Sequence, residues 1–543
     1  MSHKTFNRGL LGAFVVLGGL AARAENLVPD TPSTGPNIWC TWGIQNHVGS
    51  QDEVAKKVRE TVRREVAFEG DQGGGADFAR SCLNEDLLFG EKGWADYWPE
   101  IRKDVYLLLD DGWDVPYNTP AKKADAFGSF ELDEKKFPTC TGTPAQRLKA
   151  LNEKMKARGW RGAAVWIAAQ AKGENYGKAR TWAPEKLRDY WRDRVLWSKE
   201  AGVAYWKVDW GVHGRDVAFR RMLTELAREL YPELTIEHSV PMGALNDYDA
   251  RTDKGTGAFA NSDAKQLAEV DATLSFAGVF RTYDVVIKPS TTIDRAAYEL
   301  ARGRALGAKG ILSVEDDMTI SVGLASAVGI MRWDNAAHDV GSRSRWEPVR
   351  AVRWQRIAPA VSMDALDVFV SKERQTDTVT FKPGSTWYQP VWGKTIVQSA
   401  PAIISRGIEN PKVTPFDKNG IAPYVMATLH PNGSFALAMA SRKTPDYNGT
   451  PRADVEVNLD CLGRKICLFG VNGNVRFRLG TTRPIEVLAQ DLAENEAIDV
   501  TDKVKIENGA LTIPAGLGGK VCRKRPGDGA EGYVVLVRAR ARP

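Results

Sequence analysis

One short stretch near the middle of the chain decides the fold: Ala204-Tyr205-Trp206-Lys207-Val208-Asp209-Trp210. Its apolar start predicts a buried strand that ends in a lysine and an aspartate, and the helical pattern 216–230 follows. In an α/β barrel, the C-terminal ends of the strands carry the catalytic groups. Lys207 can hold Asp209 ionised, because a neighbouring cation lowers the pKa of a carboxylate. Asp209 is therefore a candidate nucleophile, and a surface ion pair is the plainer interpretation.

Apolar runs typical of strands alternate with amphipathic helical patterns from about residue 37 to the 330s. The expected strands are 37–42, 105–110, 163–168, 204–209, 234–237, 274–281 and 311–314. The expected helices are 52–66, 144–158, 184–201, 216–230, 294–305 and 322–332. This alternation indicates a parallel sheet, and with an eighth strand in 340–372 it favours a (β/α)8 TIM barrel of class α/β. A doubly wound open sheet is the alternative, although no G-x-G-x-x-G follows an early strand.

The composition changes after about residue 380, where short β-rich runs are separated by turn signals. These runs are 424–429, 434–440, 455–459, 465–469, 475–479 and 533–537. Helical periodicity is largely missing there, which predicts an all-β C-terminal sandwich. The expected organisation is a signal peptide at 1–24, a catalytic barrel at 25–380 and a sandwich domain at 381–543.

The N-terminal segment has the composition of a signal peptide. Lys4 and Arg8 precede the apolar run 10–20, and Ala22-Arg23-Ala24 fits a small-x-small cleavage site. No later apolar run is long enough to span a membrane. We therefore expect a secreted or periplasmic protein with no membrane partner after cleavage. A net charge of +6 without a clustered basic stripe gives no reason to expect a nucleic-acid partner.

Six cysteines occur in the chain: Cys40, Cys82, Cys140, Cys461, Cys467 and Cys522. Export would place them in an oxidising compartment, where disulfide bonds form and persist. Three fall in each expected domain, so either one bridge crosses between the domains or each domain keeps a free thiol. No C-x-x-C spacing occurs, and no second histidine stands at ligand spacing from His238, so no metal site is expected.

Carboxylates stand at the ends of three further expected strands, the second, the fifth and the seventh. Asp110 and Asp111 end the second strand, where they can accept hydrogen bonds from neighbouring sugar hydroxyls or cap a loop. Glu237 ends the fifth strand and suits either a contact with a substrate hydroxyl or a structural salt bridge. Glu315-Asp316-Asp317 adds acid to the same rim, with too few oxygen ligands for a calcium cage.

Further candidates stand after the sixth strand and among the aromatic residues. Asp284 lies across the expected barrel mouth from Asp209, where it could protonate a leaving glycosidic oxygen. Arg281 is always charged and could anchor substrate oxygens, with a surface Arg–Asp pair as the plainer interpretation. Trp42 and Trp166 are candidate substrate-binding residues, because aromatic rings are useful platforms for sugar faces.

The order of these motifs resembles that of the melibiase-type α-galactosidases, glycoside hydrolase families 27 and 36. The matching motifs are I-W-C-T-W-G at 38–43, D-D-G-W at 110–113, K-x-D at 207–209, R-x-x-D at 281–284 and D-D-M at 316–318. The likeness spans roughly 37–335. It implies that Asp209 is the nucleophile and Asp284 the acid/base. It also implies that the sugar is bound by Asp110, Asp111 and Lys207, with Glu237 and Arg281 near its 2-hydroxyl.

The resemblance implies a retaining exo-glycosidase that acts on an oligosaccharide or polysaccharide without a cofactor. α-Galactosides are the expected substrates, and β-L-arabinopyranosides or α-N-acetylgalactosaminides are the alternatives within the clan. The chain departs from the family in the spacing between Arg281 and the acid and in the long segment 113–141. Two other classes stay open: a carbohydrate-binding protein on a degenerate barrel, and a metal-dependent hydrolase, against which the scarcity of histidine counts.

Overall fold

The computed structural model describes residues 25–48, 75–175, 181–240, 264–283, 289–332, 345–382, 393–416, 420–525 and 529–540. The expected signal peptide 1–24, the expected helix 52–66 and the candidate acid Asp284 lie outside these residues.

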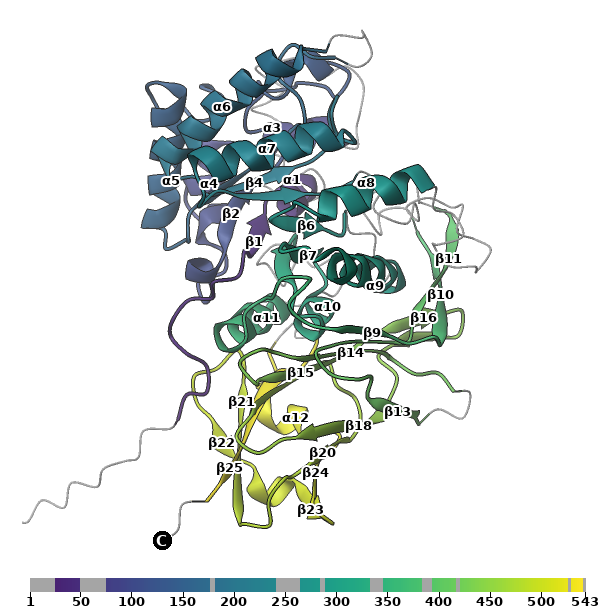
Figure 1. Ribbon diagram of the computed structural model, residues 1–543. Coiled ribbons are helices and arrows are strands. Elements are labelled where there is room, and N and C mark those ends of the chain that lie inside the picture. The colour runs from purple at the N-terminus through teal and green to yellow at the C-terminus, as the bar shows by residue number, and fades with distance from the viewer. Residues whose placement is uncertain are drawn as a thin grey trace, which may run out of the picture.

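Eight parallel strands form a closed barrel in the order β1 to β8 (Figure 1). They are β1 (Ile38–Cys40), β2 (Tyr106–Leu109), β3 (Ala163–Ile167), β4 (Tyr205–Val208), β5 (Thr235–His238), β6 (Val279–Arg281), β7 (Ile311–Glu315) and β8 (Ala327–Ile330). β1 pairs with both β2 and β8, which closes the sheet. The predicted (β/α)8 barrel is confirmed, and the open doubly wound sheet is excluded.

Helices connect the strands and cover the outside of the barrel. They include α1 (Trp42–Val48), α3 (Gly75–Cys82), α4 (Glu85–Phe89), α5 (Pro144–Ala157), α6 (Pro184–Ala201), α7 (Val217–Leu230), α8 (Ala264–Leu274), α9 (Pro289–Leu306), α10 (Met318–Gly323) and α11 (Trp346–Ile357). The start of α5 shows why this helix could be predicted from the sequence. Thr143 and Gln146 form both hydrogen bonds of a capping box, with Pro144 just inside the helix.

The eighth strand differs from the sequence-based expectation. Instead of a helix at 322–332, α10 ends at Gly323 and β8 follows, while α11 occupies part of the region in which the strand was expected. The run Ala327-Val328-Gly329-Ile330 is short and buried throughout, so periodicity alone cannot distinguish strand from helix. Tertiary pairing makes this run a strand, because β8 pairs with both β7 and β1 and so closes the barrel.

Side chains alternate between the two faces of each barrel strand. The inward-facing apolar cluster includes Ile38, Cys40, Leu108, Ala164, Trp166, Ala168 and Tyr205. The outward-facing side chains pack against the helices, among them Trp39, Leu107, Leu109, Val165, Ile167, Trp206 and Val208. Lys207 and Glu237 are register partners on β4 and β5, and Lys207 lies two residues after the inward-facing Tyr205. Both charged side chains therefore belong to the barrel interior.

The C-terminal part consists of two packed sheets, which confirms the predicted all-β sandwich. The larger sheet has the order β22 (Ile498–Asp499), β21 (Ile485–Asp491), β25 (Gly532–Ala539), β19 (Lys465–Phe469), β15 (Phe435–Ala440), β14 (Tyr424–Leu429), β12 (Ile403–Arg406) and β9 (Val368–Val370). The smaller sheet has the order β13 (Lys412–Pro415), β18 (Ala453–Asp460), β20 (Val475–Arg478), β24 (Ala510–Ile513) and β23 (Lys505–Glu507). One apolar cluster, including Val425, Leu437, Val455, Phe477 and Val535, lies between them.

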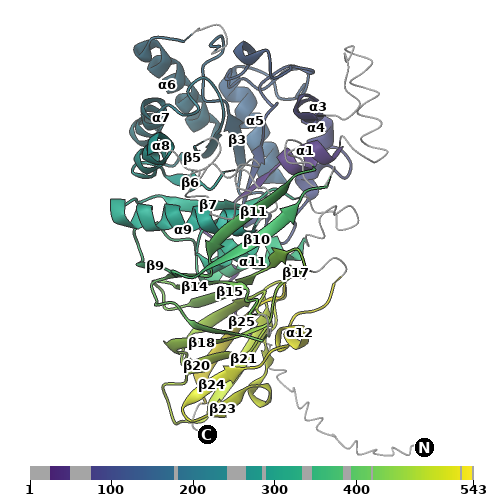
Figure 2. The same cartoon turned by 90° about the vertical axis from the view of Figure 1, so that its right-hand side faces the viewer.

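Smaller elements complete this part of the chain. They are the two-stranded pairs β10 (Arg374–Thr380) with β11 (Thr395–Pro401) and β16 (Arg442–Thr444) with β17 (Tyr447–Gly449), and the short helix α12 (Gly518–Val521). Figure 2 shows β10 and β11 beside α9, where Arg374 forms an ion pair of 2.8 Å with Asp294. The domain limits 25–380 and 381–543 stay predictions.

The barrel stands on the larger sheet, with α10 and α11 between them (Figure 1). Gly323 allows the close approach, because a Cβ there would lie 2.4 Å from Met426 Cβ. Thr428 Oγ1 donates to the Gly323 carbonyl at 2.7 Å, and Arg350 pairs with Asp491 at 2.8 Å in a buried site. The two parts therefore share apolar packing and satisfied polar contacts.

All six cysteines are buried and free, so the expected disulfide bond is not present. The Cys40 side chain, for example, lies inside the barrel, where its thiol donates a hydrogen bond to Asp110. Among the described helices, none combines the length and the apolar character needed to cross a membrane.

Candidate active site

Charged side chains converge inside the C-terminal end of the barrel. They come from β2, β4, β5, β6 and β7 or directly follow these strands: Asp110, Lys207, Asp209, Glu237, Arg281 and Glu315. Each is at most 8% exposed. Buried charges are tolerated when they are paired and hydrogen-bonded, so the pairing pattern decides what this cluster can do.

Lys207 ties three strands together. Its Nζ lies 2.9 Å from Asp110 Oδ2 and 3.3 Å from Glu315 Oε1. Burial lowers the pKa of Lys207, but Asp110 and Glu315 outweigh it and hold that pKa well above its ordinary value. Cys40 Sγ donates to the same Asp110 oxygen at 2.9 Å. Lys207 is therefore a fixed cation that neutralises carboxylates from β2 and β7.

Arg281 lies among three carboxylates. Its guanidinium nitrogens lie 3.2 Å from Asp209 Oδ1, 3.3 Å from Glu237 Oε1 and 3.2 Å from Glu315 Oε2. Nη2 also donates to Ser239 Oγ at 3.2 Å. A planar guanidinium can serve several oxygens at once, which an ammonium on a flexible stem does less well.

Asp209 is the carboxylate that the site holds ionised. Its Oδ2 accepts from Trp166 Nε1 at 3.0 Å, and its Oδ1 faces Arg281. Burial raises the pKa of Asp209, but the charges of Arg281 and Lys207 and the Trp166 hydrogen bond together lower it below its ordinary value. The Asp209 N–H also donates to Ile167 O at 3.0 Å, so the strand end is fixed to β3.

Glu237 is fully buried and engaged on both sides. Tyr205 donates its hydroxyl to Glu237 Oε2 at 2.6 Å, and Arg281 lies beside Oε1. Burial raises the pKa of Glu237, and the nearby Arg281 counteracts this only in part. The salt bridge considered from the sequence is therefore present, and a contact with a substrate hydroxyl stays a prediction.

Asp111 lies beside a second cation, Arg80 of α3. Its Oδ2 accepts from Arg80 Nε at 2.8 Å, while Oδ1 is buried and has no hydrogen-bond partner within the described residues. Burial is the main reason why the pKa of Asp111 rises to about 7. Gly112 is required next to it, since φ is +119° and a Cβ would lie 2.7 Å from Arg80 Cα.

The long segment 113–141 supports this corner. Lys136 is 1% exposed and donates to Gly112 O at 2.6 Å and to Arg80 O at 3.0 Å. It thus joins the loop after β2 to α3. The long segment therefore places a buried lysine against the backbone of Gly112, the residue after Asp111.

The two tryptophans named from the sequence lie in different environments. Trp42, the first residue of α1, is partly exposed, whereas Trp166 is fully buried and gives its indole N–H to Asp209. Their contacts with a substrate stay predictions. Trp210, which is also partly exposed, packs edge-on against Phe127 at 4.9 Å, with Arg80 6.0 Å from its ring.

Three members of the site were not identified as such from the sequence: Tyr205, Arg80 and Trp210. Glu315 was placed on the acidic rim without a role of its own, and its signal was clear, because it ends an apolar run and begins an acidic one. Arg80 carried none, since it stands in a helix far from any strand end and reaches Asp111 only through the tertiary fold.

A histidine between two acids connects the loops that follow β3 and β4. His213 Nε2 lies 3.1 Å from Glu174 Oε1, and Nδ1 lies 3.2 Å from Asp216 Oδ2. Burial lowers the pKa of His213, but hydrogen bonds to Asp216 and Glu174 raise it to about 9. The same contacts lower the pKa of both acids. A protonated His213 therefore holds the loop that begins at Asp209.

We expect this contact to make stability fall in alkali. The folded pKa of His213 is raised, so its contribution is complete below the ordinary value of 6.5 and is lost as pH rises through about 9. That difference corresponds to ~3 kcal/mol. Thermal unfolding of the wild type should therefore lose more stability between neutral pH and pH above about 9 than His213→Gln does. Parallel curves for the two proteins would contradict the assignment.

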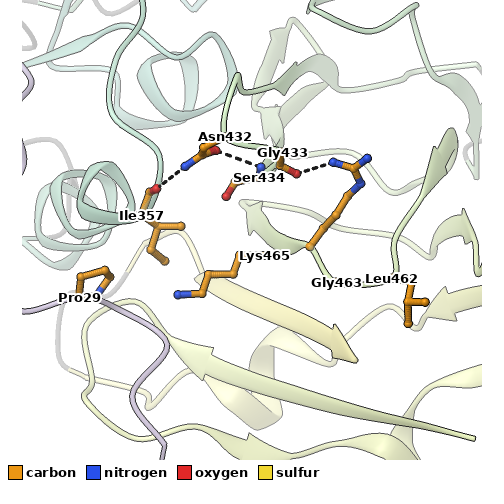
Figure 3. A pocket seen from close by; sticks show the side chains of 9 residues that line it. Pro29, Ile357, Asn432, Gly433, Ser434, Leu462, Gly463 and Lys465 are labelled. Atoms are coloured by element: carbon orange, nitrogen blue, oxygen red, sulfur yellow. Dashed lines mark hydrogen bonds between the residues drawn. The ribbon is translucent and has the colours of Figure 1, made fainter. Parts of the chain in front are cut away.

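A pocket of about 470 Å³ lies away from the barrel mouth, where Pro29, the end of α11 and two turns of the sandwich meet (Figure 3). Arg464 and Lys465 line it, but Arg464 already donates to Gly433 O and Lys465 to Leu27 O. The pocket has no carboxylate in its lining. It lacks the groups for acid–base work, so the barrel mouth is the candidate active site. In the described ranges, no group of three His, Cys, Asp or Glu side chains is placed to hold a metal ion.

No protein-family model matches the chain, and no curated protein matches it. A GH27 β-L-arabinopyranosidase from Geobacillus stearothermophilus is 9% identical, with 92% of this chain and 96% of that chain covered at a TM-score of 0.39. An α-galactosidase from Saccharomyces cerevisiae is 10% identical, with 93% and 99% covered at 0.39. A protein described as a putative α-N-acetylgalactosaminidase from Bacillus halodurans is 10% identical, with 96% and 100% covered at 0.35. These values do not assign a family, so the function must be argued from the barrel mouth.

Proposed function

We propose that the protein is a retaining glycosidase in which Asp209 is the nucleophile. The observation that carries the proposal is the state of Asp209: a buried carboxylate at the end of β4, held ionised by Arg281 and Trp166. Charge on a buried carboxylate is costly, and catalytic sites are where such costs are commonly found. Its position at the C-terminal end of a barrel strand is the usual place for catalytic groups.

The reaction would proceed in two displacements. Asp209 attacks the anomeric carbon and forms a glycosyl ester as the bond to the leaving oxygen breaks, and Asp284 gives that oxygen a proton. Asp284 then takes a proton from water, which attacks the same carbon and releases Asp209. Arg281 and Trp166 favour the carboxylate form of Asp209 and thereby make it a good leaving group in the second step.

The proposed substrate is a terminal α-galactoside or a sugar of the same stereochemistry, such as a β-L-arabinopyranoside. Asp110 and Asp111 are adjacent acceptors suited to two neighbouring hydroxyls. Asp111 Oδ1 has no partner within the described residues, and a substrate hydroxyl would satisfy it. Glu237 suits a free 2-hydroxyl better than an acetamido group, which would leave the carboxylate without a partner.

A panel of aryl glycosides tests the proposal. The measurement is kcat/KM for the α-galactoside, β-L-arabinopyranoside, α-N-acetylgalactosaminide and α-glucoside. The α-galactoside or the β-L-arabinopyranoside should be preferred. Preference for the α-glucoside or the N-acetyl sugar would reject the pocket assignment. Saturable sugar binding without turnover of any member would point to a carbohydrate-binding protein instead.

Asp284→Ala should affect substrates according to their leaving groups. A general acid contributes on the order of 10²–10⁴-fold, and a poor leaving group needs that proton whereas an activated aryl group does not. The variant should therefore lose far more kcat/KM on an alkyl or disaccharide galactoside than on a dinitrophenyl galactoside. Equal losses on both substrates would argue for a structural role of Asp284.

A further inference from the structure

Arg220 of α7 is a buried cation that contacts the backbone at the end of β4. Nη2 donates to Asp209 O at 3.1 Å and to Gly214 O at 2.7 Å. Nε donates to Gly214 O at 2.9 Å, and Nη1 to Val208 O at 3.3 Å. The side chain is 1% exposed. The guanidinium therefore fixes the strand end and the following loop on which Asp209 stands.

No carboxylate forms an ion pair with Arg220 in the part of the chain that the structure describes. Its acceptors are backbone carbonyls and one histidine nitrogen. Taking an unpaired guanidinium out of water costs free energy. Burial lowers the pKa of Arg220 to about 10, and its largest favourable charge interaction is with Asp209. Arg220 thus stays charged at neutral pH, and it contacts the backbone carbonyl of the proposed nucleophile.

His238 and Thr224 hold Arg220 in place. Arg220 Nη1 lies 3.4 Å from His238 Nδ1, and a guanidinium can only donate, so this nitrogen must accept. The proton of the neutral ring is then on Nε2, which lies 2.8 Å from Thr224 Oγ1. The Thr224 hydroxyl donates to Arg220 O at 3.3 Å and completes a closed circuit. Burial and the charge of Arg220 hold the pKa of His238 well below its ordinary value.

We propose that Arg220 is a positioning residue for Asp209, which fixes the strand end through the carbonyls of Val208, Asp209 and Gly214 and places a buried cation against the backbone of Asp209. The proposal deepens the glycosidase assignment, on which its kinetic consequence rests. It also explains the histidine that the sequence placed beside Glu237: His238 faces α7 and orients Arg220.

The other groups that face Asp209 are already engaged elsewhere. Arg281 also forms ion pairs with Glu237 and Glu315, and Lys207 forms ion pairs with Asp110 and Glu315. Trp166 contributes a neutral hydrogen bond. Arg281 lowers the pKa of Arg220 through its like charge, whereas Tyr283 and Asp216 raise it. Removing the Arg220 charge should therefore raise the pKa of Asp209, but by less than removing Arg281 would, because Arg281 and Lys207 lower that pKa more.

The ionisation of Asp209 can be read without substrate from the indole N–H of Trp166. This proton is donated to Asp209 Oδ2, so its NMR shift should follow the carboxylate, and Trp166→Phe identifies the resonance by its loss. In Arg220→Gln, the titration midpoint should move up by at most about one pH unit, which corresponds to ~1.4 kcal/mol. Arg220→Lys, which keeps the charge, should move it less. Asp209→Asn should abolish the titration.

Arg406 provides a matched control. It is also buried and donates to backbone carbonyls, Leu324 O at 2.6 Å and Ser362 O at 2.8 Å, but it lies between barrel and sandwich. Arg406→Gln should lower the melting temperature and leave the Trp166 midpoint unchanged. A folded Arg220→Gln with an unshifted midpoint would overturn the proposal and leave Arg220 with a structural role. Arg220→Met gives the same reading should the glutamine variant not fold.

The roles of Asp209 and Arg220 can be rejected independently of each other. If Asp209→Asn keeps its turnover, the glycosidase assignment of Asp209 is lost, while the Trp166 midpoint still tests Arg220. If Asp209→Asn is inactive and the midpoint does not move in Arg220→Gln, the positioning role is rejected and the nucleophile stands. A shifted midpoint should be accompanied by an acid limb of kcat/KM displaced in the same direction.

Discussion

Asp209→Asn is expected to abolish turnover of every aryl glycoside that the protein cleaves. The amide is close in size and can still accept from Trp166, but it cannot form the glycosyl ester, so the first displacement has no nucleophile. The loss of kcat should be on the order of 10⁴-fold or more, the scale seen when a reacting group is removed from a catalytic unit. The measurement is kcat on an activated aryl α-galactoside.

Added azide separates this role from a structural one. A small anion can enter the space of the lost carboxylate and attack the same carbon, which should restore part of the activity and give a glycosyl azide of inverted configuration. Asp193→Asn, which changes an exposed acid on α6, should behave like the wild type. Near-normal kcat in Asp209→Asn would remove Asp209 from the reaction.

The barrel was predictable because local pattern and tertiary structure agree along most of the chain. Runs such as Val105–Leu109 are apolar on both faces, as strands buried between a barrel interior and a helix layer must be. Their polar residues come at the strand ends, where the mouth of a barrel lies. The order of acids and cations in the sequence was therefore enough to name Asp110, Lys207, Asp209, Glu237 and Arg281.

Partners across the barrel could not be predicted in the same way. The sequence set Lys207 beside Asp209, two residues away, whereas the closest carboxylates to Lys207 Nζ come from β2 and β7. Strand stagger around the barrel fixes those pairs, and no local pattern encodes it. The prediction of the eighth strand was wrong for a related reason. Its short apolar run becomes a strand because it pairs with β7 and β1, and no local pattern encodes that pairing.

Arg281→Met should be the most damaging substitution for stability in the barrel mouth. It removes the cation shared by Asp209, Glu237 and Glu315, and breaking a buried ion pair typically costs roughly 3–5 kcal/mol. The carboxylates left behind then have raised folded pKa values. For such acids stability is lost as pH rises, so the deficit in urea unfolding should be larger at pH 8 than at pH 5. Activity should fall as well, because Asp209 loses the cation that does most to keep it ionised.

A second substitution distinguishes stability from chemistry. After Arg281 is removed, Glu237 loses its ion pair and keeps, within the described residues, the hydrogen bond from Tyr205, while its burial favours the protonated acid. Arg281→Met/Glu237→Gln makes that side chain permanently neutral, so it should recover much of the stability lost at pH 8. Activity should stay low, because Asp209 still lacks Arg281, the cation that lowers its pKa most. Arg350→Met, which breaks the equally buried pair with Asp491, should cost comparable stability and leave the kcat of the folded protein unchanged. If the double variant regained activity together with stability, Arg281 would act only as a structural support, and the case for its direct effect on Asp209 would fall.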